Sequence, residues 1–135
     1  MSTLGDEIKL ASGAKKGAET APRVIGLSLK DRSAVMPAGR GADAAYWLDT
    51  KSGAFVSSTY YMPDVPAWVK AFNARHIADS HLGKDWTPLS PPSVSLKQMP
   101  KELGTPFYEA VFGSPFGNDL LLEFATNALT HERMG

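Results

Sequence analysis

The sequence predicts an α/β domain, and three patterns in it carry that prediction. A short apolar run at 24–29 is typical of a strand buried on both faces, as in a parallel sheet. Segments 45–49 and 54–61 are rich in aromatic and β-branched residues, and the turn-forming residues 50–53 join them, which predicts a β-hairpin. Stretches of helical period flank these segments, and the longest covers 118–133.

The first expected helix covers residues 4–11. Thr3, followed three residues later by Asp6, resembles a capping box with aspartate in the role of glutamate. Leu4 and Ile8 then lie one helical turn apart, which predicts an apolar face on this helix.

Two connections surround the apolar run 24–29. The small and charged residues of 13–22 predict a solvated loop before it. Residues 33–39, which follow it, predict a short helix or turn that Pro37 and Gly39 end.

The second half of the chain alternates helical and irregular stretches. A helix is expected at 66–73, because Pro66 suits a first turn and Val69 begins an apolar face. Residues 76–112 hold five prolines and no sustained period, which predicts a long, irregular, proline-rich excursion with isolated short strands. The last helix is expected at 118–133, from apolar residues repeating with helical spacing.

Composition excludes several classes of protein. The 135 residues suffice for one domain with a hydrophobic core, since 43% of them are hydrophobic. The net charge is zero, whereas a nucleic-acid-binding chain usually carries a basic excess, so we expect no nucleic-acid partner. The absence of cysteine excludes disulfides and thiolate zinc sites. No apolar run is long enough to span a membrane, and Asp6 and Glu7 stand where a secretory signal needs an apolar core.

The triplet Lys30, Asp31 and Arg32 directly follows the expected strand. If the chain stays extended there, Lys30 and Arg32 project to the same side, because side chains alternate along a strand. Two cations then converge at the carboxyl end of a buried strand, where open α/β sheets bind ligands, and a phosphate suits them. The alternative is a solvated charged turn in which Asp31 neutralises its neighbours.

The remaining candidates read more simply as structural. His76 and His81 match no standard zinc spacing and predict a polar loop, and His131 predicts a surface residue. The hydroxyl residues 57–59 lack the motif that frames a nucleophilic serine, and their β-propensity predicts a strand. Residues 113–118 lack the G-K-[ST] ending of a phosphate loop and predict the start of a helix. From its residues alone, the sequence offers one candidate anion site and no complete catalytic set.

The order of several motifs resembles the bacterial members of the alkaline phosphatase superfamily. The resemblance covers nearly the whole chain and is weakest over 76–112. It implies that residues 1–135 form part of an alkaline-phosphatase-like domain of sheet and helices. The segments that carry it are 4–11, 24–32, 36–39, 42–47, 55–61, 66–69, 72–73 and 114–119.

The most similar subgroup has a threonine nucleophile and two zinc ions, and shares a domain with nucleotide pyrophosphatases and phosphodiesterases. In it, a lysine and an arginine two residues apart contact nonbridging oxygens of the phosphoryl group, and they match Lys30 and Arg32. The resemblance thus favours the anion site, with a small phosphate ester as substrate and phosphomonoesterase activity. Arg40 departs from the pattern, because similar sequences often have histidine there.

The family's nucleophile and metal ligands have no counterpart in this chain. The resemblance therefore implies an internal fragment of a phosphatase, whose intact parent attacks phosphorus in line with a zinc-activated alkoxide. We expect the chain alone to bind no zinc and to be inactive. Relatives of this type are mostly exported, which implies a periplasmic or secreted parent.

Two other classes of function stay open at this point. The chain could be a non-catalytic anion-binding module, or an interaction module whose aromatic surface binds a protein partner. Phosphate-dependent thermal stabilisation separates the first class from the second. The sequence gives no indication of the oligomeric state.

Overall fold

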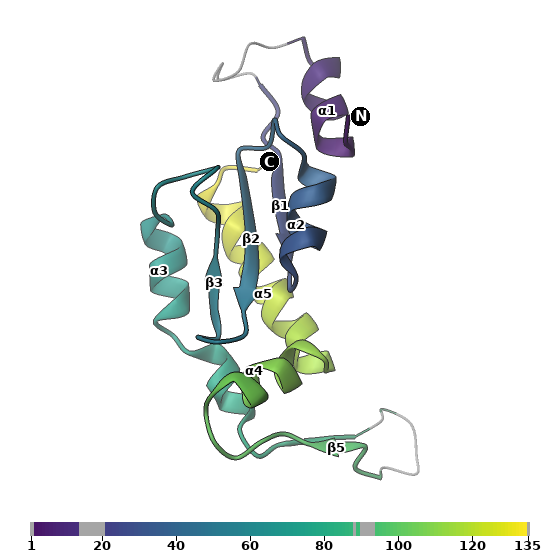
Figure 1. The fold of residues 1–135 in the computed structure, drawn as a ribbon, viewed down its shortest axis with the longest axis vertical. Helices are drawn as coiled ribbons and strands as arrows, with labels where there is room; N and C mark the ends of the chain where they lie inside the picture. Colours follow the sequence, from purple (N-terminus) through teal and green to yellow (C-terminus); the bar gives the residue numbers. More distant parts are fainter. Residues whose placement is uncertain (1, 14–20, 88, 90–93, 135) are drawn as a thin grey trace.

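The computed structural model describes residues 2–13, 21–87, 89 and 94–134 (Figure 1). Strands and helices alternate along the first half of the chain, and helices dominate the second half. The elements within these residues are α1 (Leu4–Ala11), β1 (Ile25–Ser28), α2 (Asp31–Ala38), β2 (Ala44–Asp49), β3 (Ala54–Val56), α3 (Ala67–Asn73), the 3-10 helix η1 (Ile77–His81), β4 (Asp85–Trp86), β5 (Lys97–Gln98), α4 (Thr105–Phe112) and α5 (Pro115–His131).

The central sheet has the strand order β1-β2-β3. β1 runs parallel to β2, with Leu27 opposite Tyr46, and α2 makes the crossover that parallel neighbours require. β2 and β3 form an antiparallel hairpin, with Leu48 opposite Phe55. The predicted α/β class and the predicted hairpin are both confirmed.

The first strand is shorter and less buried than the sequence suggests. β1 covers four residues, all of them half-buried, so the prediction of a strand at 24–29 buried on both faces is wrong in extent and burial. The reason lies in its neighbours, because among the described residues only β2 pairs with it. Helix α2 lies directly on β1 at Gly26, where an added Cβ would stand 2.1 Å from the carbonyl oxygen of Ala34.

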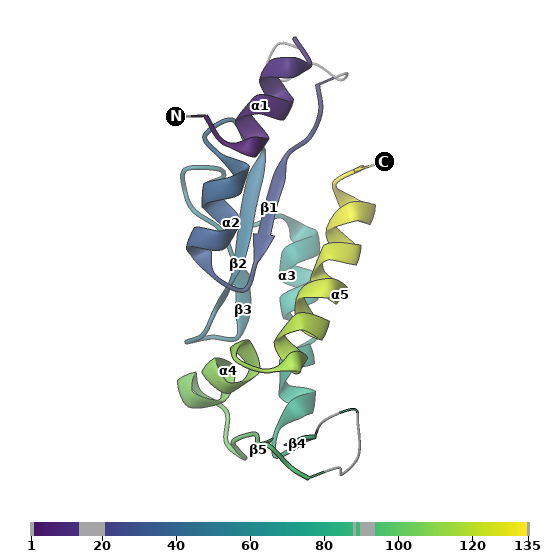
Figure 2. The same cartoon turned by 90° about the vertical axis from the view of Figure 1, so that its right-hand side faces the viewer.

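Helices cover the two faces of the sheet unequally (Figure 2). α2 packs on one face, against β1 and β2, and α3 and α5 lie on the other face. Phe124 of α5 stands at the centre of that second layer, with its ring stacked 3.9 Å from the ring of Phe55. Tyr46 and Phe72 contact the same ring edge-on. These contacts form an aromatic core between the sheet and the second layer of helices.

Helix α1 begins with the predicted capping box. The Thr3 N–H donates to the carboxylate of Asp6, and the Asp6 N–H donates to Oγ1 of Thr3, both at 3.2 Å. The predicted apolar face, however, does not pack on this chain, since Leu4 is 71% exposed and Ile8 is also exposed. α1 instead contacts α2 through Gly5, where a Cβ would stand 2.0 Å from a carbonyl oxygen of α2.

Helix α2 begins earlier than the predicted segment 33–39. It starts at Asp31 and contains Pro37 in its last turn, so Pro37 does not end it. A proline there removes a single intrahelical donor close to the helix end. Gly39 follows with φ +81° as the C-cap, in agreement with the predicted stop.

The excursion at 76–112 is more regular than predicted. It contains η1 and the two-stranded sheet of β4 and β5, which confirms isolated short strands. It also contains helix α4, which the sequence analysis read as irregular. Pro106 lies in the first turn of α4, where a proline is tolerated, and Phe107 and Val111 are buried. The expected loop at 13–22 and the prolines of the excursion fall partly on residues 14–20, 88 and 90–93, outside the described residues.

The other two helices lie close to their predicted positions. α3 begins at Ala67 and ends at Asn73, whose side-chain amide accepts from the N–H of Phe55 and donates to its carbonyl oxygen. α5 starts at Pro115, three residues earlier than predicted, and ends before Arg133. In the part of the chain that the structure describes, no helix is both long and apolar enough to cross a membrane.

Candidate functional site

Lys30 and Arg32 lie where β1 passes into α2. The strand ends at Ser28, Lys30 is the extended N-cap of α2, and Arg32 is already helical. The argument that strand alternation aims both side chains to one side is therefore wrong, because Asp31 starts a helix. That the two cations form an anion site remains a prediction.

The two cations line neighbouring cavities. Arg32 lines a cavity of about 840 Å³ beside α2, and Lys30 lines one of about 460 Å³ at the end of the sheet. Asp31 and Trp47 line both, so the two cavities share a wall. The structure thus places the two cations, which are separated by one residue, in adjacent cavities and not in a single pocket.

Both cations are available for an anionic ligand. Lys30 and Arg32 are exposed, and neither forms an ion pair within the described part of the chain. Asp31, the obvious internal partner, accepts a hydrogen bond from the backbone N–H of Arg32 at 2.7 Å. This geometry differs from the charged turn in which Asp31 neutralises both neighbours through their side chains.

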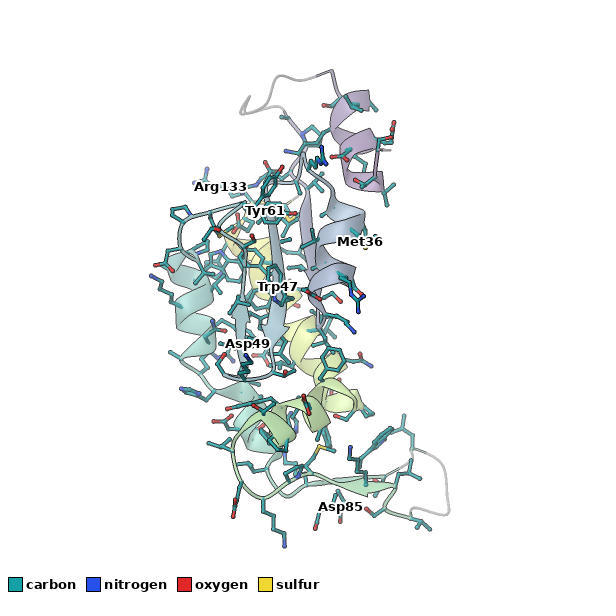
Figure 3. All side chains as sticks on the ribbon, in the orientation of Figure 1. Met36, Trp47, Asp49, Tyr61, Asp85 and Arg133 are labelled. Carbon is teal, nitrogen blue, oxygen red and sulfur yellow. The ribbon has the colours of Figure 1, made fainter. Side chains whose placement is uncertain are left out.

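The larger cavity has an aromatic wall and an arginine near each end of α2. Trp47 and Tyr61 lie on one face of the sheet, beside the helix that carries Met36 (Figure 3). Arg32 stands at the start of this helix and Arg40 just beyond its end. The full lining is Thr3, Asp6, Asp31, Arg32, Val35, Met36, Gly39, Arg40, Trp47, Ser58, Tyr60 and Tyr61.

The carboxylate of Asp6 belongs to this cavity and stays ionised. The N–H of Gly41 donates to it at 2.8 Å, and this bond is the main reason that the pKa of Asp6 lies below its ordinary value. Burial raises the pKa of Tyr61, and the neighbouring Tyr60 and Asp6 add to the rise. The Tyr61 hydroxyl is therefore a neutral donor around neutral pH.

The histidines do not assemble a metal site. His76 and His81 flank the 3-10 helix η1 at its start and end, so the predicted polar loop is a helical turn. His81 stacks on Phe116 with ring centroids 4.4 Å apart, and burial, followed by nearby Lys84, lowers its pKa. His131 is exposed, as predicted, and stacks on an aromatic ring of α3. No group of three or more His, Cys, Asp or Glu side chains among the described residues could hold a metal ion.

The serines outside the cavity hold loops together. β3 ends at Val56, so 57–59 is not strand as β-propensity suggested, and the Ser57 hydroxyl donates to the Ala45 carbonyl at 2.7 Å. Ser114 is the N-cap of α5, which confirms the predicted helix entry.

Sequence reasoning missed a buried carboxylate at the end of α5. Glu132 accepts hydrogen bonds from the Trp68 indole at 2.9 Å and from the Tyr46 hydroxyl at 3.4 Å, and it pairs with Arg23. Burial, together with this carboxylate, raises the pKa of Tyr46 far above its ordinary value, so the phenol remains a donor. No pattern in the residues around Glu132 predicts that its carboxylate is buried and hydrogen-bonded, because its partners come from three other segments.

The chain is similar in sequence to several known proteins. No family model matches it. It is 35% identical to a protein named calcium-transporting ATPase from Myroides odoratus, over all of this chain and 28% of the relative. It is 31% identical to the alkaline phosphatases PhoV of Synechococcus elongatus and PafA of Elizabethkingia meningoseptica, over 100% and 98% of this chain and 27% of each relative.

The solved structures agree with the sequences. The crystal structure of alkaline phosphatase PafA superposes with a TM-score of 0.73 and 29% identity, over 99% of this chain and 29% of that one. A second structure, of a PafA variant with threonine, asparagine, lysine and arginine substitutions, gives the same TM-score. The chain spans little more than a quarter of the length of these relatives. The sequence and fold comparisons both support the alkaline phosphatase superfamily, to whose members this chain corresponds in part.

Proposed function

We propose that Lys30 and Arg32 contact the phosphoryl group of a small phosphate ester, within a phosphomonoesterase of which this chain is an internal part. The observation that carries the proposal is the pair itself, two exposed cations separated by one residue and without ion-pair partners in the described chain. The substituted lysine and arginine of the PafA variant are likewise separated by one residue. The superfamily relationship supports equating the two pairs.

The chemistry of the pair suits a transferring phosphoryl group. Negative charge on the equatorial oxygens of that group must be stabilised as the bond to the leaving group breaks. Arg32 can offer a two-pronged donor to two oxygens, and Lys30 a point charge to a third. A doubly charged monoester gains more from two cations than a singly charged diester, so the pair favours phosphomonoesters.

The nucleophile and the metal ions are proposed to come from outside this chain. The resemblance implies two zinc ions, but the described residues do not fit them, because they offer no group of three suitable ligands. In the PafA variant, the substituted threonine precedes the lysine by more residues than this chain has before Lys30. We therefore assign this chain the contact with the phosphoryl oxygens and none of the metal chemistry.

One relative's name raises a second candidate. An ATPase also transfers a phosphoryl group, so the same two cations could serve ATP hydrolysis. We favour small phosphate esters over ATP as substrates, because two of the three relatives described above and both solved structures are alkaline phosphatases. The resemblance further supports a periplasmic or secreted parent. The zero net charge and the short apolar runs of the sequence favour neither a nucleic-acid nor a membrane partner.

The test compares monoester and diester hydrolysis by the intact parent protein. Arg32→Ala should lower kcat/KM for p-nitrophenyl phosphate about a hundredfold and should lower it much less for bis-p-nitrophenyl phosphate. Lys101→Ala is the control and should leave both rates unchanged, because Lys101 lies beside Gly83 and lines neither cavity. An unaltered preference in Arg32→Ala contradicts the proposal. Phosphate binding without turnover of an ester or of ATP favours a non-catalytic anion-binding module.

A further inference from the structure

The larger cavity contains a second cation, Arg40, that the proposed function does not use. Arg40 lines both this cavity and a smaller one of about 320 Å³ formed with Tyr60 and Tyr61. Its side chain is exposed and forms no ion pair among the residues that the structure describes. The cavity therefore has one arginine near each end of α2, and neither forms an ion pair with another described residue.

The backbone that presents Arg40 is fixed from two sides. Its carbonyl oxygen accepts the Tyr60 hydroxyl at 3.1 Å, and the Tyr61 hydroxyl lies 3.5 Å from the carbonyl oxygen of Gly39. On the other side, the N–H of Gly41 donates to Asp6. The position of Arg40 is thus set by α1 and by the loop after β3, which lowers the conformational cost of binding a ligand there.

The cavity also contains two carboxylates, which oppose an anionic ligand. Asp6 accepts hydrogen bonds from the N–H of Thr3, at the start of α1, and from the N–H of Gly41, in the loop after α2. Asp31 accepts a hydrogen bond from the N–H of Arg32 at the start of α2. Both lie at helix N-termini, where the aligned peptide dipoles offset a negative charge. The arginines, in contrast, have no neutralising partner in the described chain.

The two arginines lie at opposite ends of the helix that walls the cavity. Arg32 stands in the first turn of α2 and Arg40 two residues beyond its last residue, so most of this helix, which is roughly 12 Å long, separates the points where the two side chains leave the backbone. The volume between them lies within the range of cavities that hold small molecules. We propose that this cavity takes a phosphomonoester that carries a second anionic group, with one anion at Arg32 and the other at Arg40. The inference rests on the proposed function, because Arg32 is there the contact for the reacting phosphoryl group.

The experiment uses a matched pair of probes with the 135-residue chain. Fructose 1,6-bisphosphate and fructose 6-phosphate differ only in the second phosphate, and their dissociation constants are measured by calorimetric titration at low ionic strength. The wild-type chain should bind the bisphosphate about tenfold more tightly. Arg40→Ala should remove this preference, and Lys101→Ala, which removes an equal charge outside the cavity, should retain it.

The outcomes separate this inference from the proposed function. The second-anion site is overturned if the wild-type chain binds fructose 1,6-bisphosphate and fructose 6-phosphate with equal affinity. It is also overturned if Lys101→Ala loses the preference for the bisphosphate as Arg40→Ala does. If Lys30→Ala/Arg32→Ala binds fructose 6-phosphate as the wild-type chain does, the proposed phosphoryl contact fails instead. A bisphosphate preference that depends on Arg40 and not on Lys101 supports the inference.

Discussion

The guanidinium of Arg23 lies 2.7 Å from the buried carboxylate of Glu132, 109 residues further along the chain. This ion pair joins the segment ahead of β1 to the end of α5. The same carboxylate accepts hydrogen bonds from Trp68 and Tyr46, so it connects the sheet to two helices.

Replacing this carboxylate should destabilise the fold. Glu132→Gln is expected to lower the free energy of unfolding by about 1–3 kcal/mol, because it removes the ion pair and leaves buried donors with a poorer acceptor. Urea unfolding followed by tryptophan fluorescence measures the change. Glu123→Gln is the control, since its pair with Arg75 is exposed and should be worth less than about 1 kcal/mol. Equal losses in the two variants would contradict the role of Glu132.

The loop that carries Arg40 depends on a glycine. Gly39→Ala places a Cβ 2.0 Å from Oγ1 of Thr3, at a backbone φ of +81°. We expect a loss of about 3 kcal/mol from strain and clash together, measured by thermal and urea unfolding. Gly13→Ala is the matched control, because Gly13 also has a positive φ but nothing within 4 Å of an added Cβ, so about 1 kcal/mol should be lost. A smaller loss in Gly39→Ala than in Gly13→Ala would refute the packing of α1 on this loop.

Stability should fall in acid through Asp43. Burial raises the pKa of Asp43, but the Lys9 ammonium at 2.7 Å and the N–H of Val24 lower it more, so the net pKa lies below the ordinary value. A carboxylate with a depressed folded-state pKa stabilises the fold above its unfolded-state pKa. That stabilisation is lost as the pH falls below about 4. Urea unfolding at pH 7 and pH 3 should therefore show a smaller acid loss in Asp43→Asn than in the wild-type chain, and an equal loss would contradict the assignment.

The isolated chain should not hydrolyse p-nitrophenyl phosphate at an enzymatic rate, even with added zinc. Phosphoryl transfer needs a nucleophile held against phosphorus and activated by a metal or a base, and Lys30 and Arg32 supply neither. A steady-state assay of the repurified chain, with and without zinc, measures this. Zinc-dependent turnover that disappears on mutation of a serine or threonine in this chain would show that it carries its own active site.

Local signals in the sequence predicted the elements that depend on a few neighbouring residues. Thr3 and Asp6 predicted the start of α1, because a capping box needs only residues three apart. The hairpin followed from aromatic and β-branched residues on both sides of a turn with Gly53, whose φ of +71° favours glycine. A Cβ at Gly53 would also meet the ring of Tyr108. This second reason for glycine depends on a distant residue and could not be predicted.

Two expectations were wrong because a proline and an aspartate each lie in the first turn of a helix. Pro106 suggested a loop, yet a proline in a first turn is compatible with helix α4. Asp31 suggested a neutralising partner for Lys30 and Arg32, whereas it is the first residue of α2, where an acidic side chain is favourable. Reading Asp31 as a helix start would have shown that strand alternation does not apply to Arg32, which lines a different cavity from Lys30.

The cavity itself was beyond sequence reasoning. Its aromatic wall combines Trp47 from β2 with Tyr60 and Tyr61 from the loop after β3, and α2 supplies the opposite side. These segments meet only through sheet pairing and the crossover helix. Arg40 stood out in the sequence as a departure from a family pattern, but its place in the cavity depends on contacts with Asp6 and Tyr60.

The most direct test of the central claim is the binding of inorganic phosphate to the 135-residue chain. Titration followed by backbone amide chemical shifts should give saturable changes at Lys30 and Arg32, and Lys30→Ala/Arg32→Ala should abolish them. The double variant Lys97→Ala/Lys101→Ala removes the same charge elsewhere and should bind phosphate as the wild-type chain does. If Lys30→Ala/Arg32→Ala binds phosphate with unchanged affinity, these two residues are not the phosphate contact and the account is contradicted.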